Sequence, residues 1–169
     1  HNAAIEIARK GGDHTLNYFK QSIDVERKSD SSPVTIADRE AESIMRRAIA
    51  EQFPGHGIVG EEYGTENEES AVQWILDPID GTKSFIHSIP LYTTLVGVLY
   101  NDEPVVGIIY APALDELCDA ATGRGARLNG DLCRVRACAD LSEASFMTTD
   151  VYTAADFEYG KQLDTLIDK

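Results

Sequence analysis

Residues 77–82 read Asp-Pro-Ile-Asp-Gly-Thr, which sets two carboxylates, Asp77 and Asp80, three residues apart. The apolar and β-branched run 72–76 comes directly before them and predicts a buried strand that delivers Asp77 to its end. Glu61 follows a second short apolar run and offers a third carboxylate. Hard carboxylate and carbonyl oxygens without nearby His or Cys suit Mg²⁺ or Mn²⁺ better than zinc. The spacing therefore predicts a divalent metal site.

The residues between and after the two carboxylates favour a phosphate ligand at the same place. Pro78 restricts Asp77 to an extended backbone and fixes its own φ, which can leave the Ile79 carbonyl free to act as a ligand. Gly81 has no Cβ where an anion must approach closely. A helix can start at Thr82, and its first backbone N–H groups, which lack partners within the helix, can bind phosphate. Taken singly, Asp-Pro and Asp-Gly pairs are ordinary turn formers, but three carboxylates together favour a metal-dependent phosphate site.

Two helices are predicted ahead of these motifs. Asn2 is a candidate cap for a helix that reaches about Arg27, and Gly11-Gly12 weakens its middle, which a close backbone contact would explain. Residues 37–53 place apolar side chains at helical spacing until a Pro-Gly pair ends the second helix.

The start of the second predicted helix holds a further carboxylate whose role has two interpretations. Thr35 and Asp38 form a capping-box pattern, so the Asp38 carboxylate could serve only to cap the start of the helix. A catalytic role is the alternative. The local sequence leaves both possibilities open.

The rest of the chain predicts a largely antiparallel sheet. Residues 93–100 and 105–110 flank a polar turn and predict a hairpin. We expect further strands near residues 116–121, 126–128, 133–135 and 145–148, and a helix that begins at Asp156. Two N-terminal helices packed on such a sheet give an α+β fold, which we expect to form a single domain over residues 1–169.

Three motifs in combination resemble the inositol monophosphatase family, whose members are Mg²⁺-dependent and often Li⁺-inhibited sugar-phosphate phosphatases. The motifs are Thr35-Ile36-Ala37-Asp38, Gly60-Glu61-Glu62 and the whole segment 77–82, and the similarity runs in order from about Ile5 to Gly130. The resemblance implies that the chain is the N-terminal half of an inositol-monophosphatase-like α/β sandwich. It also implies two or three Mg²⁺ ions, with Mn²⁺ as a substitute, and a homodimer.

The resemblance implies a role for each motif residue. The implied metal ligands are Glu61, Asp77, the Ile79 carbonyl and Asp80. The implied catalytic residues are Glu61 together with the pair Asp38 and Thr82, which helps to activate the attacking water. Asp80 and the backbone N–H groups of Gly81 and Thr82 would face the substrate phosphate.

The substrate is predicted from weaker signals. Residues 83–86, Pro90-Leu91 and residues 112–114 resemble the histidinol-phosphatase branch more than the inositol branch. We therefore prefer histidinol phosphate, in histidine biosynthesis, to inositol 1-phosphate, with 3′-phosphoadenylate and fructose bisphosphate less favoured.

A later Trp-Asp motif of the family has no counterpart here, since the only Trp is Trp74. That motif completes the second metal site, so we expect that a C-terminal portion is missing. A non-catalytic metal-binding module is the alternative if the natural chain ends near Lys169.

Composition narrows the partners. With 29 acidic against 15 basic residues, the formal net charge of −14 disfavours nucleic acid and anionic membranes, and leaves a small phosphate monoester as the expected partner. No apolar run approaches the roughly 18 residues of a membrane span.

The three cysteines form no Cys-x-x-Cys pair, so we expect a reducing cytoplasm and no disulfide framework. No Gly-x-Ser-x-Gly motif and no twelve-residue calcium loop occurs.

Overall fold

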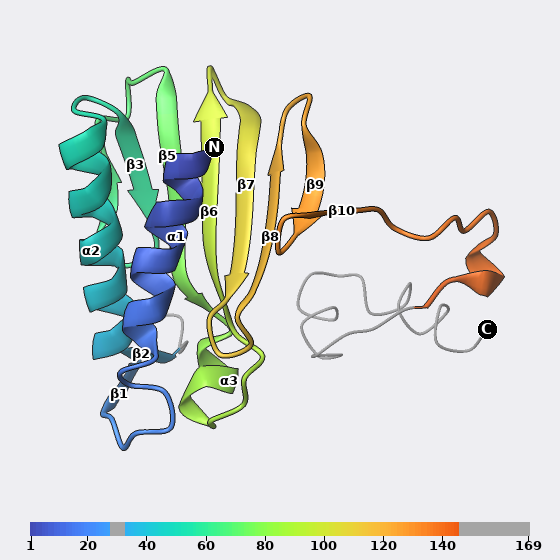
Figure 1. Cartoon of the computed structure of the whole chain (residues 1–169). Coiled ribbons are helices and arrows are strands. Elements are labelled where there is room, and N and C mark those ends of the chain that lie inside the picture. Colours follow the sequence, from blue (N-terminus) through green and yellow to red (C-terminus); the bar gives the residue numbers. More distant parts are fainter. Residues whose placement is uncertain (28–32, 146–169) are drawn as a thin grey trace, which may run out of the picture. The chain divides into compact units, whose positions relative to one another are not determined.

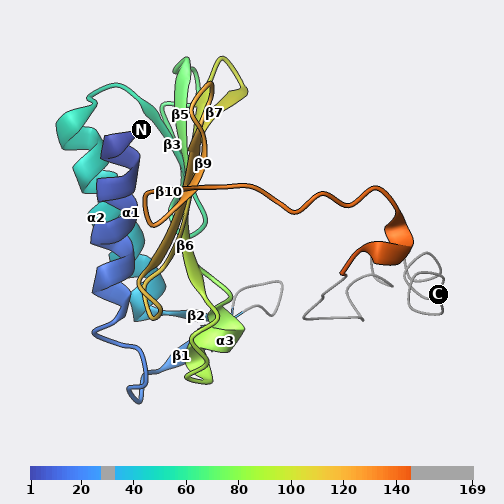
Figure 2. The ribbon, with the colours of Figure 1, turned by 45° about the vertical axis from the view of Figure 1, so that its right-hand side comes forward.

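Two helices, α1 (Asn2–Thr15) and α2 (Ile36–Gln52), pack against each other on one face of a large sheet (Figures 1 and 2). The computed structural model describes residues 1–27 and 33–145. The chain divides into two compact units, residues 1–133 and 134–169. The first contains both helices and the sheet, and in the second the described residues include a short 3₁₀ helix, Leu141–Glu143. The single domain expected over residues 1–169 stays a prediction.

The sheet has eight strands in the order β10-β9-β8-β7-β6-β5-β3-β4. All neighbouring strands are antiparallel except β3 and β5, which run parallel. The strands are β3 (Gly57–Gly60), β4 (Gly64–Glu66), β5 (Val72–Asp80), β6 (Thr93–Tyr100), β7 (Glu103–Ala111), β8 (Glu116–Ala121), β9 (Gly125–Leu128) and β10 (Asp131–Cys133). The α+β class and the largely antiparallel sheet are thus confirmed.

Smaller elements gather where β3 and β5 end. A separate antiparallel ribbon pairs β1 (Val25–Arg27) with β2 (Pro33–Thr35), and β2 leads directly into α2. The five-residue helix α3 (Thr82–Ile86) follows β5 and contacts β2. Figure 1 shows β1, β2, α3 and the first turn of α2 at the same end of the sheet.

The sheet is irregular at the Asp-Pro-Ile-Asp segment. Asp77 pairs with Leu95 and Asp80 pairs with Thr93, so β5 has one more residue than β6 across this stretch. Bulges of this kind redirect side chains and are common next to active sites. The Thr94 hydroxyl is fully buried and donates to the Pro78 carbonyl at 2.8 Å, which ties the bulge to the neighbouring strand.

The main core lies between the two helices and the sheet. Its buried side chains include Ile7, Met45, Ile49, Trp74, Val96 and Ile108. The predicted close approach at Gly11-Gly12 is confirmed. A Cβ on Gly11 would lie 2.4 Å from Met45 Sδ, and one on Gly12 would lie 2.6 Å from Tyr110 Cδ1, so any larger residue would displace the core.

The first helix differs from its prediction at both ends. Its N-cap is His1 rather than Asn2, and it stops at Thr15 rather than near Arg27. After Thr15 the apolar side chains no longer continue the buried face of α1 and instead pack in a second hydrophobic cluster. There the ring centroid of Phe19 lies 5.8 Å from that of Phe85 and 5.2 Å from that of Tyr92. Tertiary packing therefore decides where this helix ends.

The other predicted elements fall close to their observed bounds, with a few differences. β5 continues to Asp80, and the last described strand is Asp131–Cys133 rather than 133–135. The exposed strands β1 and β4 and the short strand β2 were not predicted, because three residues carry no clear alternation. Apart from Ser145, the strand predicted at 145–148 lies outside the described residues, as does the helix expected from Asp156.

Candidate active site

The Glu61 and Asp77 side chains meet where two parallel strands end. β3 and β5 run parallel, with Gly60 opposite Leu76. The next residue of each strand segment, Glu61 after Gly60 and Asp77 after Leu76, therefore lies at the same edge of the sheet. The Glu61 N–H donates to the Leu76 carbonyl at 3.3 Å, which fixes the Glu61 backbone beside β5. The two carboxyl groups share a hydrogen bond, and Asp80 is near enough for its charge to act on Asp77.

Crowding of carboxylates changes the protonation of Asp77. Burial, together with the charge and hydrogen bond of Glu61 and the charge of Asp80, raises the pKa of Asp77 to about 8. A carboxyl group surrounded by negative charge either holds a proton or takes a cation in its place. The hard oxygen donors at this edge fit Mg²⁺ or Mn²⁺, which the charge of the cluster would attract.

The three carboxylates are close to one another but are not arranged as a complete set of ligands around one ion. Within residues 1–27 and 33–145, no three His, Cys, Asp or Glu side chains are already assembled to hold one ion. Glu61 and Asp77 are in contact, whereas Asp80 acts on Asp77 through its charge and is itself exposed. The structure thus places the three predicted carboxylate ligands at one edge, with the pair Glu61 and Asp77 at the centre.

The Ile79 carbonyl is less free than Pro78 led us to expect. It accepts a hydrogen bond from the Thr82 hydroxyl at 3.0 Å, while the Ile79 N–H donates to Asp77 Oδ1 at 3.1 Å. The carbonyl therefore has one hydrogen-bond partner within the turn, and its role as a metal ligand stays a prediction. A carbonyl oxygen has two lone pairs, so one remains for a metal ion.

Asp38 uses its two carboxylate oxygens for two different purposes. Oδ2 accepts from the Thr35 N–H at 2.8 Å and from the Thr35 hydroxyl at 2.6 Å, which completes the capping box of α2. Oδ1 faces Thr82, whose hydroxyl lies 3.5 Å away. The cap and the position beside Thr82 are therefore compatible.

The surroundings of Asp38 also affect its protonation. Burial raises the pKa of Asp38 and the charge of Glu61 raises it further, while the hydrogen bonds from Thr35 lower it. Asp38 is 2 % exposed and within electrostatic range of Glu61, so the two carboxylates belong to one charged cluster.

Gly81 is required by the turn that begins α3. Its φ of +90° lies in the left-handed region, and an added Cβ would approach the Leu91 carbonyl oxygen to 3.1 Å. Gly81 caps the helix and its carbonyl accepts the Phe85 N–H at 3.1 Å. The N–H groups of the first turn, starting at Thr82, have no acceptors within the helix.

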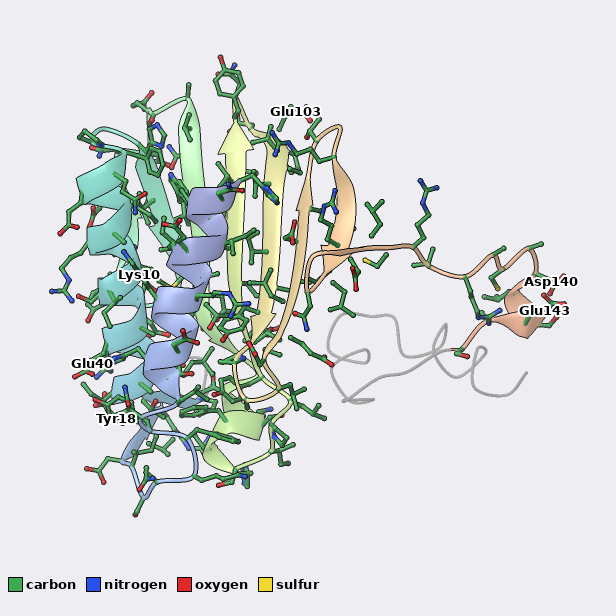
Figure 3. All side chains as sticks on the ribbon, in the orientation of Figure 1. Lys10, Tyr18, Glu40, Glu103, Asp140 and Glu143 are labelled. Carbon is green, nitrogen blue, oxygen red and sulfur yellow. The ribbon has the colours of Figure 1, made fainter. Side chains whose placement is uncertain are left out.

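Glu42 is a buried residue near the site that sequence reasoning missed. It lies on α2, is fully buried, and accepts hydrogen bonds from the backbone of the turn that contains Glu61. The available signal was spacing, because Asp38, Glu42 and Arg46 follow one another at intervals of four on one face of the helix. Glu40 also lies on α2, where Figure 3 labels it together with Tyr18. Its Oε2 accepts from the Tyr18 hydroxyl and lies 2.7 Å from His14 Nε2.

Comparison with known proteins places this arrangement in a family. A sequence model described as the inositol monophosphatase family matches residues 1–163. The chain belongs to this family. It is 42 % identical over 148 residues to a histidinol-phosphatase of Chlorobaculum parvum, covering 87 % of this chain and 57 % of that protein. It is 36 % identical over 160 residues to inositol monophosphatase 2 of Solanum lycopersicum, covering 92 % of this chain and 60 % of that protein.

A solved structure of the family has the same fold. The IMPase of Thermotoga maritima matches with a TM-score of 0.80 and 32 % identity, covering 95 % of this chain and 64 % of that one. The chain thus spans little more than half the length of the curated relatives it matches, at 57 % and 60 %. Among the described helices, none has the length and apolar character needed to cross a membrane.

Proposed function

We propose that this chain is the metal- and phosphate-binding portion of a phosphatase that hydrolyses a small alcohol phosphate in the presence of Mg²⁺. The observation that carries the proposal is the meeting of the Glu61 and Asp77 carboxyl groups where β3 and β5 end, with Asp80 near enough for its charge to act on Asp77. A fold gains no stability from carboxylates gathered without compensation, so a bound cation is the simplest explanation of the cluster.

Glu61, Asp77, the Ile79 carbonyl and Asp80 would hold the metal. When bound, Mg²⁺ would lower the pKa of a coordinated water and supply positive charge to the phosphoryl oxygens and the leaving alkoxide. Mn²⁺ has similar ligand preferences and would be a substitute. Two or three ions are the number that the resemblance to the family implies.

Asp38 and Thr82 would orient the attacking water. The Thr82 hydroxyl has one proton, which it donates to the Ile79 carbonyl at 3.0 Å or to Asp38 Oδ1 at 3.5 Å. In either case its oxygen can accept a hydrogen bond from a water. Asp38, whose pKa burial raises, can accept a proton through Oδ1, while Thr35 holds Oδ2 in place.

Histidinol phosphate is the substrate we propose, with inositol 1-phosphate as the alternative. The support is the greater identity to a histidinol-phosphatase, 42 %, than to an inositol monophosphatase, 36 %. The test is release of phosphate by the full-length protein with Mg²⁺ from histidinol phosphate, inositol 1-phosphate, fructose 1,6-bisphosphate and 3′-phosphoadenylate. We expect the highest kcat/KM with histidinol phosphate. A higher value with inositol 1-phosphate would move the protein to the other branch, and metal binding without any phosphate release would favour a non-catalytic module.

We also propose a homodimer in a reducing, cytoplasmic setting. Membership of the family supports the dimer, and the free state of Cys118, Cys133 and Cys138 supports the compartment. Sedimentation equilibrium of the full-length protein tests the dimer.

A further inference from the structure

We propose that Glu42 is a positioning residue, which holds the backbone of the turn at residues 60–63 and so directs the Glu61 carboxylate toward the metal site. This inference rests on the proposed function, because it gives Glu42 a purpose only if Glu61 binds metal. Glu42 itself does not belong to the set of residues that the metal would contact.

The Glu42 carboxylate accepts hydrogen bonds from two backbone N–H groups of the turn. Oε2 accepts the Glu62 N–H at 2.7 Å, and Oε1 accepts the Tyr63 N–H at 3.2 Å. On the other side, the Glu61 N–H donates to the Leu76 carbonyl at 3.3 Å. The backbone of Glu61 is therefore held between β5 and the Glu42 side chain.

Close contact at Gly60 shows how tightly the turn sits on this carboxylate. A Cβ on Gly60 would lie 2.0 Å from Glu42 Oε1 and 2.7 Å from Arg46 Nη2. Neither side chain has room to move away, because Glu42 is fully buried and Arg46 is 7 % exposed. Glycine at position 60 is thus a direct consequence of the buried carboxylate below it.

Arg46 makes the burial of Glu42 tolerable. Its Nε lies 2.7 Å from Glu42 Oε1, and its Nη1 lies 3.0 Å from Glu66 Oε1. Arg46 Nη2 also donates to the Gly64 carbonyl, further along the same loop. A buried carboxylate costs folding free energy unless it is paired and hydrogen-bonded, and Glu42 has both kinds of partner.

A hydrophobic side chain at position 42 would serve the core without this cost, since buried ion pairs are often matched or exceeded in stability by apolar replacements. The Glu42 carboxylate instead accepts hydrogen bonds from two backbone N–H groups next to Glu61 in the chain. Removal of a group that orients a metal ligand typically weakens metal binding by about tenfold to a hundredfold. The contacts of Glu42 are those of such a group.

The experiment compares three variants of the chain by Mn²⁺ affinity, with free Mn²⁺ followed by electron paramagnetic resonance. Glu42→Gln keeps the size of the side chain and removes its charge and one acceptor. Glu51→Gln is the matched control, because it makes the same chemical change at an exposed position of the same helix. Gly60→Ala leaves the Glu42 carboxylate intact and displaces the turn. Circular dichroism establishes that each variant is folded.

We expect Glu42→Gln and Gly60→Ala to weaken Mn²⁺ binding by about tenfold to a hundredfold and Glu51→Gln to change it less than about twofold. A folded Glu42→Gln with the affinity of the unmodified chain would overturn the proposal. If Glu42→Gln does not fold, unchanged affinity in Gly60→Ala would overturn it equally.

Amide hydrogen exchange in the metal-free chain separates this proposal from the proposed function. In Glu42→Gln the Glu62 and Tyr63 amides should exchange at least about tenfold faster than in Glu51→Gln, whether or not metal binds. Slow exchange at both amides in a folded Glu42→Gln would refute the anchoring role. An unmodified chain that binds no Mn²⁺ would instead refute the metal site while leaving the anchoring measurable.

Discussion

The two ends of α2 pack against the same strand in opposite ways. At the C-terminal end, Phe53 lies 5.4 Å from Trp74 and is stacked 5.2 Å from His56 between ring centroids. The Trp74 indole N–H donates to His56 Nδ1 at 3.1 Å, so even the polar atom of this cluster has a partner. This end is apolar, aromatic and satisfied.

At the N-terminal end, β5 presents carboxylates instead. Asp77 is half-buried beside Glu61, and the Asp38 carboxylate, which caps α2, lies within electrostatic range of Glu61 as well. The aromatic end therefore stabilises the fold, whereas the crowded carboxylates lower its stability when no cation is bound. Changes at the two ends should therefore separate binding from folding.

The largest effect is expected at the carboxylate end. Asp77→Asn keeps the shape of the side chain and removes one charge, so the activity of the full-length protein and the metal affinity should fall by orders of magnitude. The melting temperature of the metal-free protein should stay the same or rise, because carboxylate repulsion is relieved. Steady-state kinetics at saturating Mg²⁺ and a thermal melt with chelator measure the two quantities. Unchanged turnover would remove Asp77 from the site.

The reverse pattern is expected at the aromatic end. Trp74 is 4 % exposed in the main core, and Trp74→Ala should lower the free energy of unfolding by about 3–5 kcal/mol. Urea denaturation measures this loss, and Mn²⁺ affinity at low temperature should be nearly unchanged in the molecules that remain folded. Tyr100→Ala, at a 54 % exposed position on the neighbouring strand, is the control and should cost far less. Equal losses at the two positions would contradict the aromatic end as the source of stability.

A pH dependence of the metal-free protein follows from Asp77. Its pKa is about 8 in the folded state against an ordinary value of 3.8, so the folded state binds more protons than the unfolded state between these values. Stability should therefore fall as pH rises from about 4 to about 8 and level off above that range. Urea midpoints across this range test the trend, which Asp77→Asn should flatten. A midpoint that rises with pH in the unmodified chain, together with no flattening, would contradict the assigned pKa.

A smaller effect separates catalysis from capping at Thr82 and Asp38. If the two orient water together, Thr82→Ala and Asp38→Asn should each lower kcat with modest effects on KM, and the double variant should lose little more than either. A cap alone would cost about 1 kcal/mol of stability and leave kcat almost intact. A double-mutant cycle on kcat, with metal affinity measured alongside, distinguishes the two. Additive losses would argue against a shared role.

Sequence reasoning succeeded where local pattern and structure agree. The helical spacing of residues 37–53 and the hairpin around residues 101–103 carry their own periodicity, and both lie within about two residues of α2, β6 and β7. The gathering of Glu61 with Asp77 was also predictable, since strand ends in one sheet bring such residues together.

What sequence reasoning missed depends on distant contacts. The end of α1 is set by Phe19 packing on Phe85 and Tyr92, which no local pattern reveals. Glu42 resembled a solvated helix residue, because a charged side chain at helical spacing is normally exposed. Only the turn beneath which it lies shows why it is buried.

The most direct test of the metal site is anomalous diffraction from crystals of the protein soaked with Mn²⁺. We predict a peak bounded by the Glu61 and Asp77 carboxylates, with the Ile79 carbonyl and Asp80 as further ligands and Mn²⁺ absent from Asp77→Asn crystals under the same conditions. A strong peak elsewhere, with Glu61 and Asp77 still hydrogen-bonded to each other, would contradict the proposed metal site.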